Sequence, residues 1–259
     1  MAQSPPLIFI FPICDLCSVT VTINDSVCSQ KTYPVLPASG FGQVQPYALL
    51  PNSSGDCQIN FNLGEVELSV QSALANKFQS PPDIPAGLHS LEVLNSTCPD
   101  LEVTGLNTTV SVTDGESTSI IFWLGEAGRL EVSQSDYINR IEMPGAGKPY
   151  VKVLWSSLNS SVEHYDLVLK REKNPDNSEK WDIIELGNQT MVGDTEPVEV
   201  RKPTDFVVFL NQEKLGDVTF KQGANYNLLL VGEGESGNPV LVVHQVSARL
   251  SCQSPVFSV

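Results

Sequence analysis

The stretch Val110-Ser-Val-Thr-Asp-Gly-Glu-Ser-Thr-Ser-Ile-Ile-Phe-Trp-Leu-Gly125 decides the fold class, because it returns later in the chain. It joins a short alternating strand, a turn and a continuous apolar run, and the same order is found in Val218-Thr-Phe-Lys-Gln-Gly-Ala-Asn-Tyr-Asn-Leu-Leu-Leu-Val-Gly232. One offset of 108 residues relates Val110 to Val218, Gly115 to Gly223, and Ile120 to Leu228. We therefore predict two copies of one β-hairpin, each with a glycine in the turn before a buried central strand.

Short segments with period-two alternation of apolar and polar residues recur through the rest of the chain and predict half-buried strands. They are residues 19–23, 57–61, 66–70, 91–93, 110–112, 150–154, 165–169, 181–184, 206–210 and 240–243. The only helical turn that we expect lies near residues 72–78. Strands at this spacing, without alternating helices, predict an all-β fold of two tandem, immunoglobulin-like antiparallel β-sandwich lobes.

The boundary between the two copies is predicted at Pro144-Gly-Ala-Gly147, a run typical of linkers. This gives a first β-sandwich lobe at residues 51–146 and a second at 147–250. Residues 1–50 form an N-terminal junction segment that includes a leading strand, and residues 251–259 form a C-terminal tail.

Composition narrows the class of partner. The chain has 259 residues, of which 41% are hydrophobic, and its 30 acidic and 15 basic residues give a net charge of -15. Such a negative surface repels phosphate backbones and anionic lipid headgroups, so we expect no nucleic-acid partner. The longest apolar stretch, residues 6–14, falls short of the roughly 20 residues that a membrane-spanning helix needs.

Six Asn-x-Ser/Thr sequons favour a glycosylated surface outside the cytosol, although a Ser/Thr-rich composition is the alternative explanation. The candidate glycosylation sites are Asn24, Asn52, Asn95, Asn107, Asn159 and Asn188. We expect them on turns or outward-facing strand positions. The N-terminus carries no convincing secretion signal, because the apolar run from Leu7 lacks a basic segment before it and is interrupted by Pro12.

Six cysteines are compatible with disulfide bonds in an oxidising compartment, but their spacing leaves 15 pairings open. These candidate disulfide cysteines are Cys14, Cys17, Cys28, Cys57, Cys98 and Cys252. The Cys14-Asp-Leu-Cys17 spacing resembles a redox motif, but no βαβ pattern surrounds it and no second pair completes a zinc site.

No motif predicts catalysis. His89, His164 and His244 are isolated from one another, and there is no HExxH helix and no Gly-x-Ser-x-Gly elbow. The loop Gly232-Glu-Gly-Glu-Ser-Gly237 lacks the lysine of a phosphate-binding loop and is doubly acidic. We therefore expect no catalytic residue, no cofactor and no metal, and the chain is not predicted to be an enzyme.

Several segments of the sequence resemble segments of one protein family. The segment Ser119-Ile-Ile-Phe-Trp-Leu124 followed by Lys148-Pro-Tyr-Val-Lys-Val-Leu-Trp-Ser-Ser-Leu-Asn159 is similar to the junction between two lobes in the large extracellular domain of animal proton-coupled oligopeptide transporters. The segments Gly223-Ala-Asn-Tyr-Asn-Leu-Leu-Leu and Val240-Leu-Val-Val-His-Gln-Val-Ser-Ala248 resemble its last hairpin and exit strand. Val256-Phe-Ser-Val259 and Phe9-Ile-Phe-Pro-Ile-Cys-Asp15 look like pieces of the family's membrane helices.

The resemblance covers residues 50–250 and implies an accessory domain on the extracellular face of the plasma membrane. Its partner would be the transmembrane helix bundle of the parent transporter, which takes up di- and tripeptides, with extracellular basic proteins as further partners. The bundle itself is missing, so no proton-binding or peptide-binding residue carries over. The chain would be a fragment or helix-lacking form, or a secreted relative. The alternative is a secreted or cell-surface immunoglobulin-like binding or adhesion module.

Overall fold

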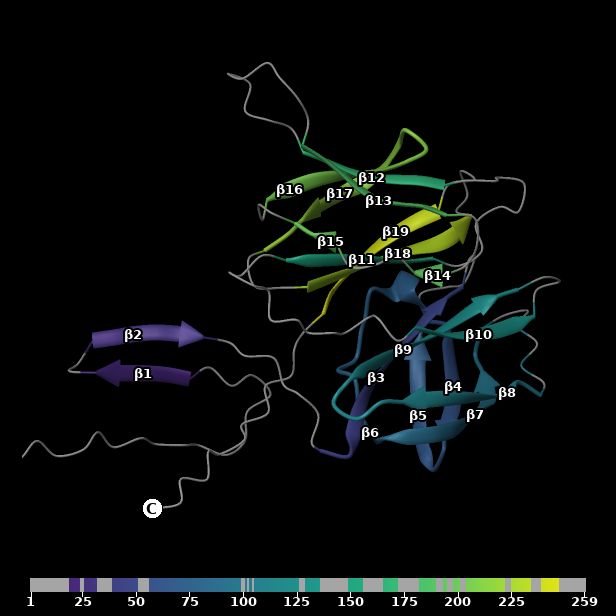
Figure 1. The fold of residues 1–259 in the computed structure, drawn as a ribbon. Coiled ribbons are helices and arrows are strands. Elements are labelled where there is room, and N and C mark those ends of the chain that lie inside the picture. Colours follow the sequence, from purple (N-terminus) through teal and green to yellow (C-terminus); the bar gives the residue numbers. More distant parts are fainter. Residues whose placement is uncertain are drawn as a thin grey trace, which may run out of the picture.

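The computed structural model describes most of the chain between residues 19 and 246. The described residues are 19–23, 26–31, 39–50, 56–98, 101, 103, 105–125, 129–135, 149–155, 165–171, 182–189, 193–194, 198–200, 204–221, 225–233 and 239–246. The first two strands, β1 (Val19–Ile23) and β2 (Ser26–Lys31), form a two-stranded antiparallel sheet of their own. The remaining strands form four larger sheets (Figure 1).

The first β-sandwich pairs a sheet of order β10-β9-β3-β6 with a sheet of order β5-β4-β7-β8. Its strands are β3 (Phe41–Leu49), β4 (Gln58–Leu63), β5 (Val66–Gln71), β6 (Asp83–Pro85), β7 (Gly87–Ser96), β8 (Asn107–Val112), β9 (Ser117–Leu124) and β10 (Leu130–Ser135). The expected helical turn is a single turn of 3-10 helix, η1 (Ala73–Ala75), which the side chain of Ser72 caps.

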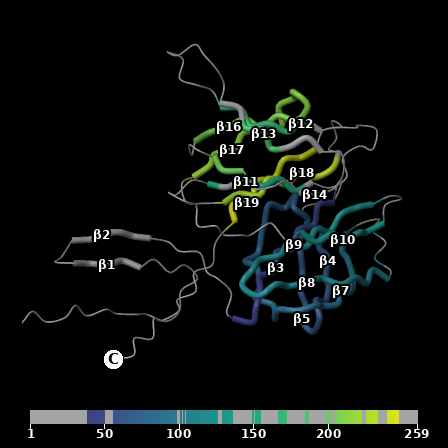
Figure 2. The backbone as a smooth tube through the Cα atoms, viewed as in Figure 1, coloured from purple at the N-terminus to yellow at the C-terminus, as the bar shows by residue number. Residues whose placement is uncertain are grey.

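The second β-sandwich pairs a sheet of order β14-β11-β18-β19, to which β15 adds beside β11, with a sheet of order β13-β12-β16-β17. Its strands are β11 (Tyr150–Trp155), β12 (Tyr165–Arg171), β13 (Asp182–Gln189), β14 (Gly193–Asp194), β15 (Val198–Glu199), β16 (Asp205–Leu210), β17 (Glu213–Thr219), β18 (Asn225–Glu233) and β19 (Pro239–Val246). In Figures 1 and 2 this sandwich runs from green to yellow, and the first from purple to teal.

The two sandwiches share one strand order. In each, the first strand lies parallel to the strand that opens the last hairpin, as β3 does to β9 and β11 to β18. The middle hairpins form the opposite sheet, with β4 against β7 and β12 against β16. The all-β sandwich class predicted from the sequence is therefore confirmed, with one parallel pair added to each otherwise antiparallel sandwich.

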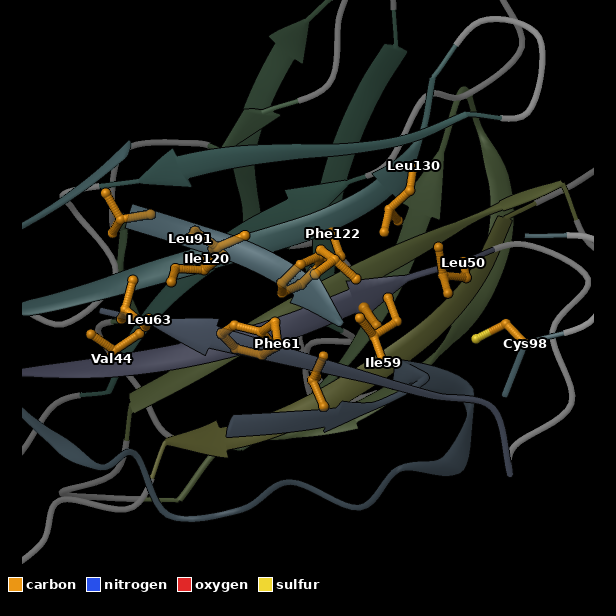
Figure 3. Packing of buried hydrophobic residues seen from close by; sticks show 14 of the residues in the cluster. Val44, Leu50, Ile59, Phe61, Leu63, Leu91, Cys98, Ile120, Phe122 and Leu130 are labelled. Carbon is orange, nitrogen blue, oxygen red and sulfur yellow. The ribbon is translucent and has the colours of Figure 1, made fainter. Parts of the chain in front are cut away.

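Each sandwich has its own core, built from the inward-facing residues of its two sheets. In the first, Phe61 of β4 and Phe122 of β9 meet at the centre, with ring centroids 4.9 Å apart (Figure 3). In the second, the ring of Phe220 packs against those of Phe206 and Tyr226, with ring centroids 5.5 and 5.0 Å apart. Val110 and Val218, which the sequence repeat pairs, are both buried in these cores.

The structure differs from the expected boundaries at the start of the first sandwich. The sequence pattern predicts no strand at residues 41–49 and leaves them in the junction segment 1–50, whereas β3 lies inside the first sandwich between β9 and β6. Gly42 and Pro46 interrupt its apolar pattern, which obscures its central position. Pro46 is tolerated because β6 pairs only with the first three residues of β3, so no partner on that side needs its missing N–H. The predicted linker at residues 144–147 and the turn glycine Gly223 lie outside the described residues.

Gly115 does lie in the turn before β9, with a positive φ of 74° that favours glycine. Within the part of the chain that the structure describes, no helix has the length and apolar character needed to cross a bilayer.

Candidate functional site: the contact between the two sandwiches

A third cluster of buried apolar residues joins the two sandwiches, and we call it the joint. It lies between the outer face of the β10-β9-β3-β6 sheet and the outer face of the β14-β11-β18-β19 sheet. Its buried members are Tyr47, Leu49, Ala73 and Ile121 of the first sandwich and Leu154, Leu229, Val231 and Val242 of the second, with Leu74, Phe78 and Trp123 packed against them.

The joint explains why the central strands are continuously apolar instead of alternating. Along β9, Ile120 and Phe122 point into the first core, whereas Ile121 between them points into the joint. Along β18, Leu228 belongs to the second core and Leu229 to the joint. A strand that is buried on both faces needs apolar residues at every position, and these runs meet that need.

Two rows of buried polar side chains cross the joint. In the second sandwich, strand pairing places Lys152 beside Asn227 and Asn227 beside His244, so one row runs across β11, β18 and β19. The facing row in the first sandwich runs across β10, β9 and β3, and its buried members are Ser135, Ser119 and Gln45.

The first link between the rows is a hydrogen bond in which Lys152 Nζ donates to Ser135 Oγ at 3.1 Å. Since both side chains are buried, this bond ties β11 of one sandwich to β10 of the other. The hydroxyl of Ser119 has no partner among the described residues, so the rows also include a polar group whose desolvation is not offset.

Tyr47, two residues beyond Gln45 on β3, makes a second link to the row of the other sandwich, with hydrogen bonds to two of its strands. Asn227 Nδ2 donates to Tyr47 Oη at 2.7 Å, and Tyr47 Oη lies 2.9 Å from His244 Nδ1. Since the phenol oxygen accepts from Asn227, its own proton is available for His244 Nδ1, and the two groups complete a chain of hydrogen bonds when that ring nitrogen carries no proton. The ring of Phe78 stacks on His244 with centroids 4.0 Å apart, which covers the imidazole.

Burial controls the ionisation of both ring groups. It lowers the pKa of His244 to about 4, because removal from water disfavours the imidazolium. It raises the pKa of the Tyr47 phenol well above its usual range, and the Asn227 hydrogen bond lowers it by less. Both side chains are therefore neutral at physiological pH, which is the state that the hydrogen-bond chain requires.

In the interactions above, His244 contacts the Tyr47 phenol and the Phe78 ring and no carboxylate. A general base near neutral pH needs a pKa close to the working pH, whereas burial lowers the pKa of His244 to about 4. The described residues hold no group of three or more His, Cys, Asp or Glu that could bind a metal ion. Beside the joint, residues 45–47, 69–71 and 77–79 line a cavity of about 20 Å³, which is the size of one water molecule.

The predicted glycosylation sites are placed as follows. Asn95 in β7 and Asn107 in β8 are exposed, and Asn188 lies in β13. Asn24, Asn52 and Asn159 lie outside the described residues. Asn95 and Asn107 belong to the sheet opposite the joint in the first sandwich.

Of the fifteen cysteine pairings left open, the described residues contain one bond, between Cys57 and Cys98, with Cα atoms 4.6 Å apart. It links the chain just before β4 to the chain just after β7, two strands that pair directly. Cys28 lies in β2. Cys14, Cys17 and Cys252 lie outside the described residues.

Sequence reasoning misses the role of His244 and Tyr47. The spacings typical of metal and catalytic sites give His244 no partner. A useful signal is its alternation with Val242 on β19, which puts both on one face of the strand. Tyr47 is missed because the sequence pattern does not predict β3. Its partners lie 180 and 197 residues away along the chain, and no local pattern joins them.

A scan against protein-family models and a search of curated proteins find no match for this chain.

Proposed function

We propose that this chain is the extracellular accessory module of a proton-coupled oligopeptide transporter. In this proposal its partner is the helix bundle of the transporter, and the bundle performs the uptake of di- and tripeptides. The module itself catalyses nothing and moves nothing, and it stands outside the bilayer as a rigid two-sandwich body.

The observation that carries the proposal is the pair of sandwiches with one strand order, fixed to each other by a buried joint. The resemblance implies two tandem lobes with a junction between residues 119–124 and 148–159, and these two segments overlap β9 and β11. They also include Ile121 and Leu154, which meet in the joint. The segment resembling the exit strand coincides with β19, which carries His244.

The net charge and the sequons also support a place outside the membrane. A charge of -15 favours solubility and opposes adsorption to anionic lipids. Proton-coupled transport needs ionisable groups along a path through about 30 Å of hydrocarbon, a demand that two β-sandwiches rich in short strands do not serve.

The test begins with the transcript. If the proposal is right, the coding sequence that flanks this chain contains apolar runs of roughly 20 residues. Flanks without such runs would instead favour the secreted or cell-surface binding module.

The second step measures accumulation of a labelled dipeptide at acidic external pH in cells expressing the flanked protein. A matched protein lacking residues 41–246 serves for comparison. We expect uptake by both proteins at equal surface expression, because the sandwiches lie outside the transport path. Complete loss on deletion would show that the sandwiches take part in the transport cycle and would overturn the accessory role. Absence of uptake by the flanked protein would overturn the transporter assignment.

A further inference from the structure

The outer face of the β5-β4-β7-β8 sheet lies on the opposite side of the first sandwich from the joint. This sheet packs one face into the first core, and the joint is formed by the opposite sheet of the same sandwich. Along β8, Val110 and Val112 point inwards and are buried, while Asn107 and Thr109 point outwards and are exposed. The face therefore looks away from the second sandwich.

Asn95 is held on this face in one orientation. A register shift between Asn60 and Phe61 pairs Asn60 with Asn95 and leaves both Leu94 and Asn95 exposed. Asn60 Nδ2 donates to Asn95 Oδ1 at 2.7 Å, and Gln58 Nε2 donates to Asn60 Oδ1 at 2.7 Å. These bonds engage the carbonyl oxygen of the Asn95 amide and not its nitrogen Nδ2, which is the atom that carries an N-linked glycan.

Asn107 lies on the same face, at the start of the edge strand β8. It pairs directly with Glu92 of β7, and Asn95 follows three residues further along that strand. At a rise of about 3.3 Å per residue, the two asparagines lie roughly 10 Å apart along the strand direction. Each begins a sequon, Asn95-Ser-Thr97 and Asn107-Thr-Thr109.

We propose that Asn95 and Asn107 both carry N-linked glycans, which make the outer face of the β5-β4-β7-β8 sheet a carbohydrate-covered surface. This inference rests on the extracellular location in the proposed function. The two glycans shield Leu94, an apolar side chain that is 42% exposed on the same face. Partners of the module then bind elsewhere, because a branched glycan at each site excludes protein from this face.

The modification is a glycosyl transfer from a polyprenyl-pyrophosphate-linked oligosaccharide to the nascent chain. A bond forms between Asn Nδ2 and C1 of the first sugar, and the bond from C1 to the pyrophosphate oxygen breaks. The amide loses one proton to a base of the transferring enzyme, and the lipid pyrophosphate leaves. The carbonyl oxygen of Asn95 is unchanged by this step, so the hydrogen bond from Asn60 persists after glycosylation.

The test expresses residues 1–259 behind an added secretion signal in a eukaryotic host and maps glycopeptides by mass spectrometry. Asn95→Gln and Thr109→Ala each remove one sequon, the second without changing Asn107. Asn62→Gln is the matched control, because Asn62 lies on the neighbouring strand β4 of the same sheet and begins no sequon. We expect each sequon variant to lose one glycan and the control to lose none.

The state of the folded protein supplies the second readout. Glycans on an exposed sheet face are removed by an endoglycosidase without denaturant, and we expect this at both sites. Unmodified Asn95 and Asn107 peptides, or glycans that are released only after unfolding, would overturn the proposal. Because the added signal forces export, such a result would count against these two sites and not against the location, which is tested separately by localising the protein without the added signal.

Discussion

Removing one oxygen atom tests whether the joint holds the two sandwiches together. The change is Tyr47→Phe, which keeps the buried ring packed against Phe78 and His244 but deletes the hydroxyl group. Two groups of the other sandwich lose their partner at once. These are Asn227 Nδ2, which donates to the phenol oxygen, and His244 Nδ1, which lies within hydrogen-bond distance of it.

The magnitude follows from burial. A buried donor or acceptor left without a partner costs about 1–3 kcal/mol, so two of them give a loss of about 2–4 kcal/mol in the free energy of unfolding. We place the value below the sum of the upper limits because His244 keeps its stacking with Phe78 and its second ring nitrogen. The apolar part of the joint is unchanged, so the variant still folds.

The assay is urea unfolding of the variant and of Tyr226→Phe, a matched control. Tyr226 is also buried, but among the described residues its phenol accepts one hydrogen bond, from the backbone N–H of Lys221 within the second sandwich. We expect the control to lose about 0.5–1.5 kcal/mol. A double-mutant cycle between Tyr47→Phe and His244→Leu should give a coupling of at least about 0.5 kcal/mol, the lower limit for contacting residues.

An equal loss in the two tyrosine variants, or a coupling of zero, would refute the reasoning. Either result would mean that the polar chain contributes no more than an ordinary hydrogen bond and that apolar packing alone carries the joint.

Three further changes test other parts of the structure. The pKa of His244 is lowered from 6.5 to about 4, so as the pH falls its imidazole is protonated in the unfolded chain before it is protonated in the folded one. The contribution of neutral His244 to the free energy of unfolding is therefore complete above pH 6.5 and should fall by about 3 kcal/mol towards pH 4. Urea unfolding at several pH values should show a shallower acid loss in His244→Gln, and parallel profiles would contradict this. Replacing Cys57 and Cys98 by serine removes a disulfide between residues 41 apart and should lower the free energy of unfolding by about 2–4 kcal/mol. Urea unfolding of the variant and of the wild type, with and without reductant, measures this, and equal unfolding midpoints would count against a structural role of the disulfide. Gly42→Ala places a Cβ 2.5 Å from the carbonyl oxygen of Thr113 and should cost about 1–3 kcal/mol by thermal unfolding, more than Gly216→Ala, where the nearest atom is Leu241 Cδ2 at 3.3 Å.

The sequence predicts the elements that repeat a local pattern. The hairpins around Val110 and Val218 are such elements, since alternation, a turn and an apolar run lie within about fifteen residues of each other. Their continuous runs also indicate burial on both faces, and Ile121 and Leu229 fulfil that indication. The pattern does not predict which element packs against the second face, because alternation shows only which face of the strand a residue occupies.

The joint escapes prediction for this reason. Lys152, Asn227 and His244 are 75 and 17 residues apart along the chain, and only the pairing of β11, β18 and β19 aligns them. A parallel pair such as β11 and β18 is the least local of sheet contacts, because its strands need a long crossover. The polar rows therefore follow from topology and are invisible in any window of sequence.

That topology also makes the two sides of the joint equivalent. Tyr47 stands opposite Ile121 in the first sandwich, as Leu154 stands opposite Leu229 in the second, and all four belong to the joint. By the same pairing, the polar row of the first sandwich corresponds to that of the second, with Ser119 in the position of Asn227 and Gln45 in the position of Lys152. In this correspondence Ser135 takes the place of His244.

Equivalent faces that meet are the mark of an isologous contact, which in a homodimer obeys a two-fold axis. Here both copies lie in one chain, so their side chains are free to differ. Lys152 binds Ser135 at one end of the rows, while at the other end His244 is bound by Tyr47, which lies two residues beyond Gln45, the counterpart of Lys152. The two ends are equivalent in position, but they differ in how they respond to mild acidification. Acid should therefore weaken the joint from the β19 end, where His244 loses its acceptor nitrogen, while the Lys152 bond to Ser135 needs no change of protonation.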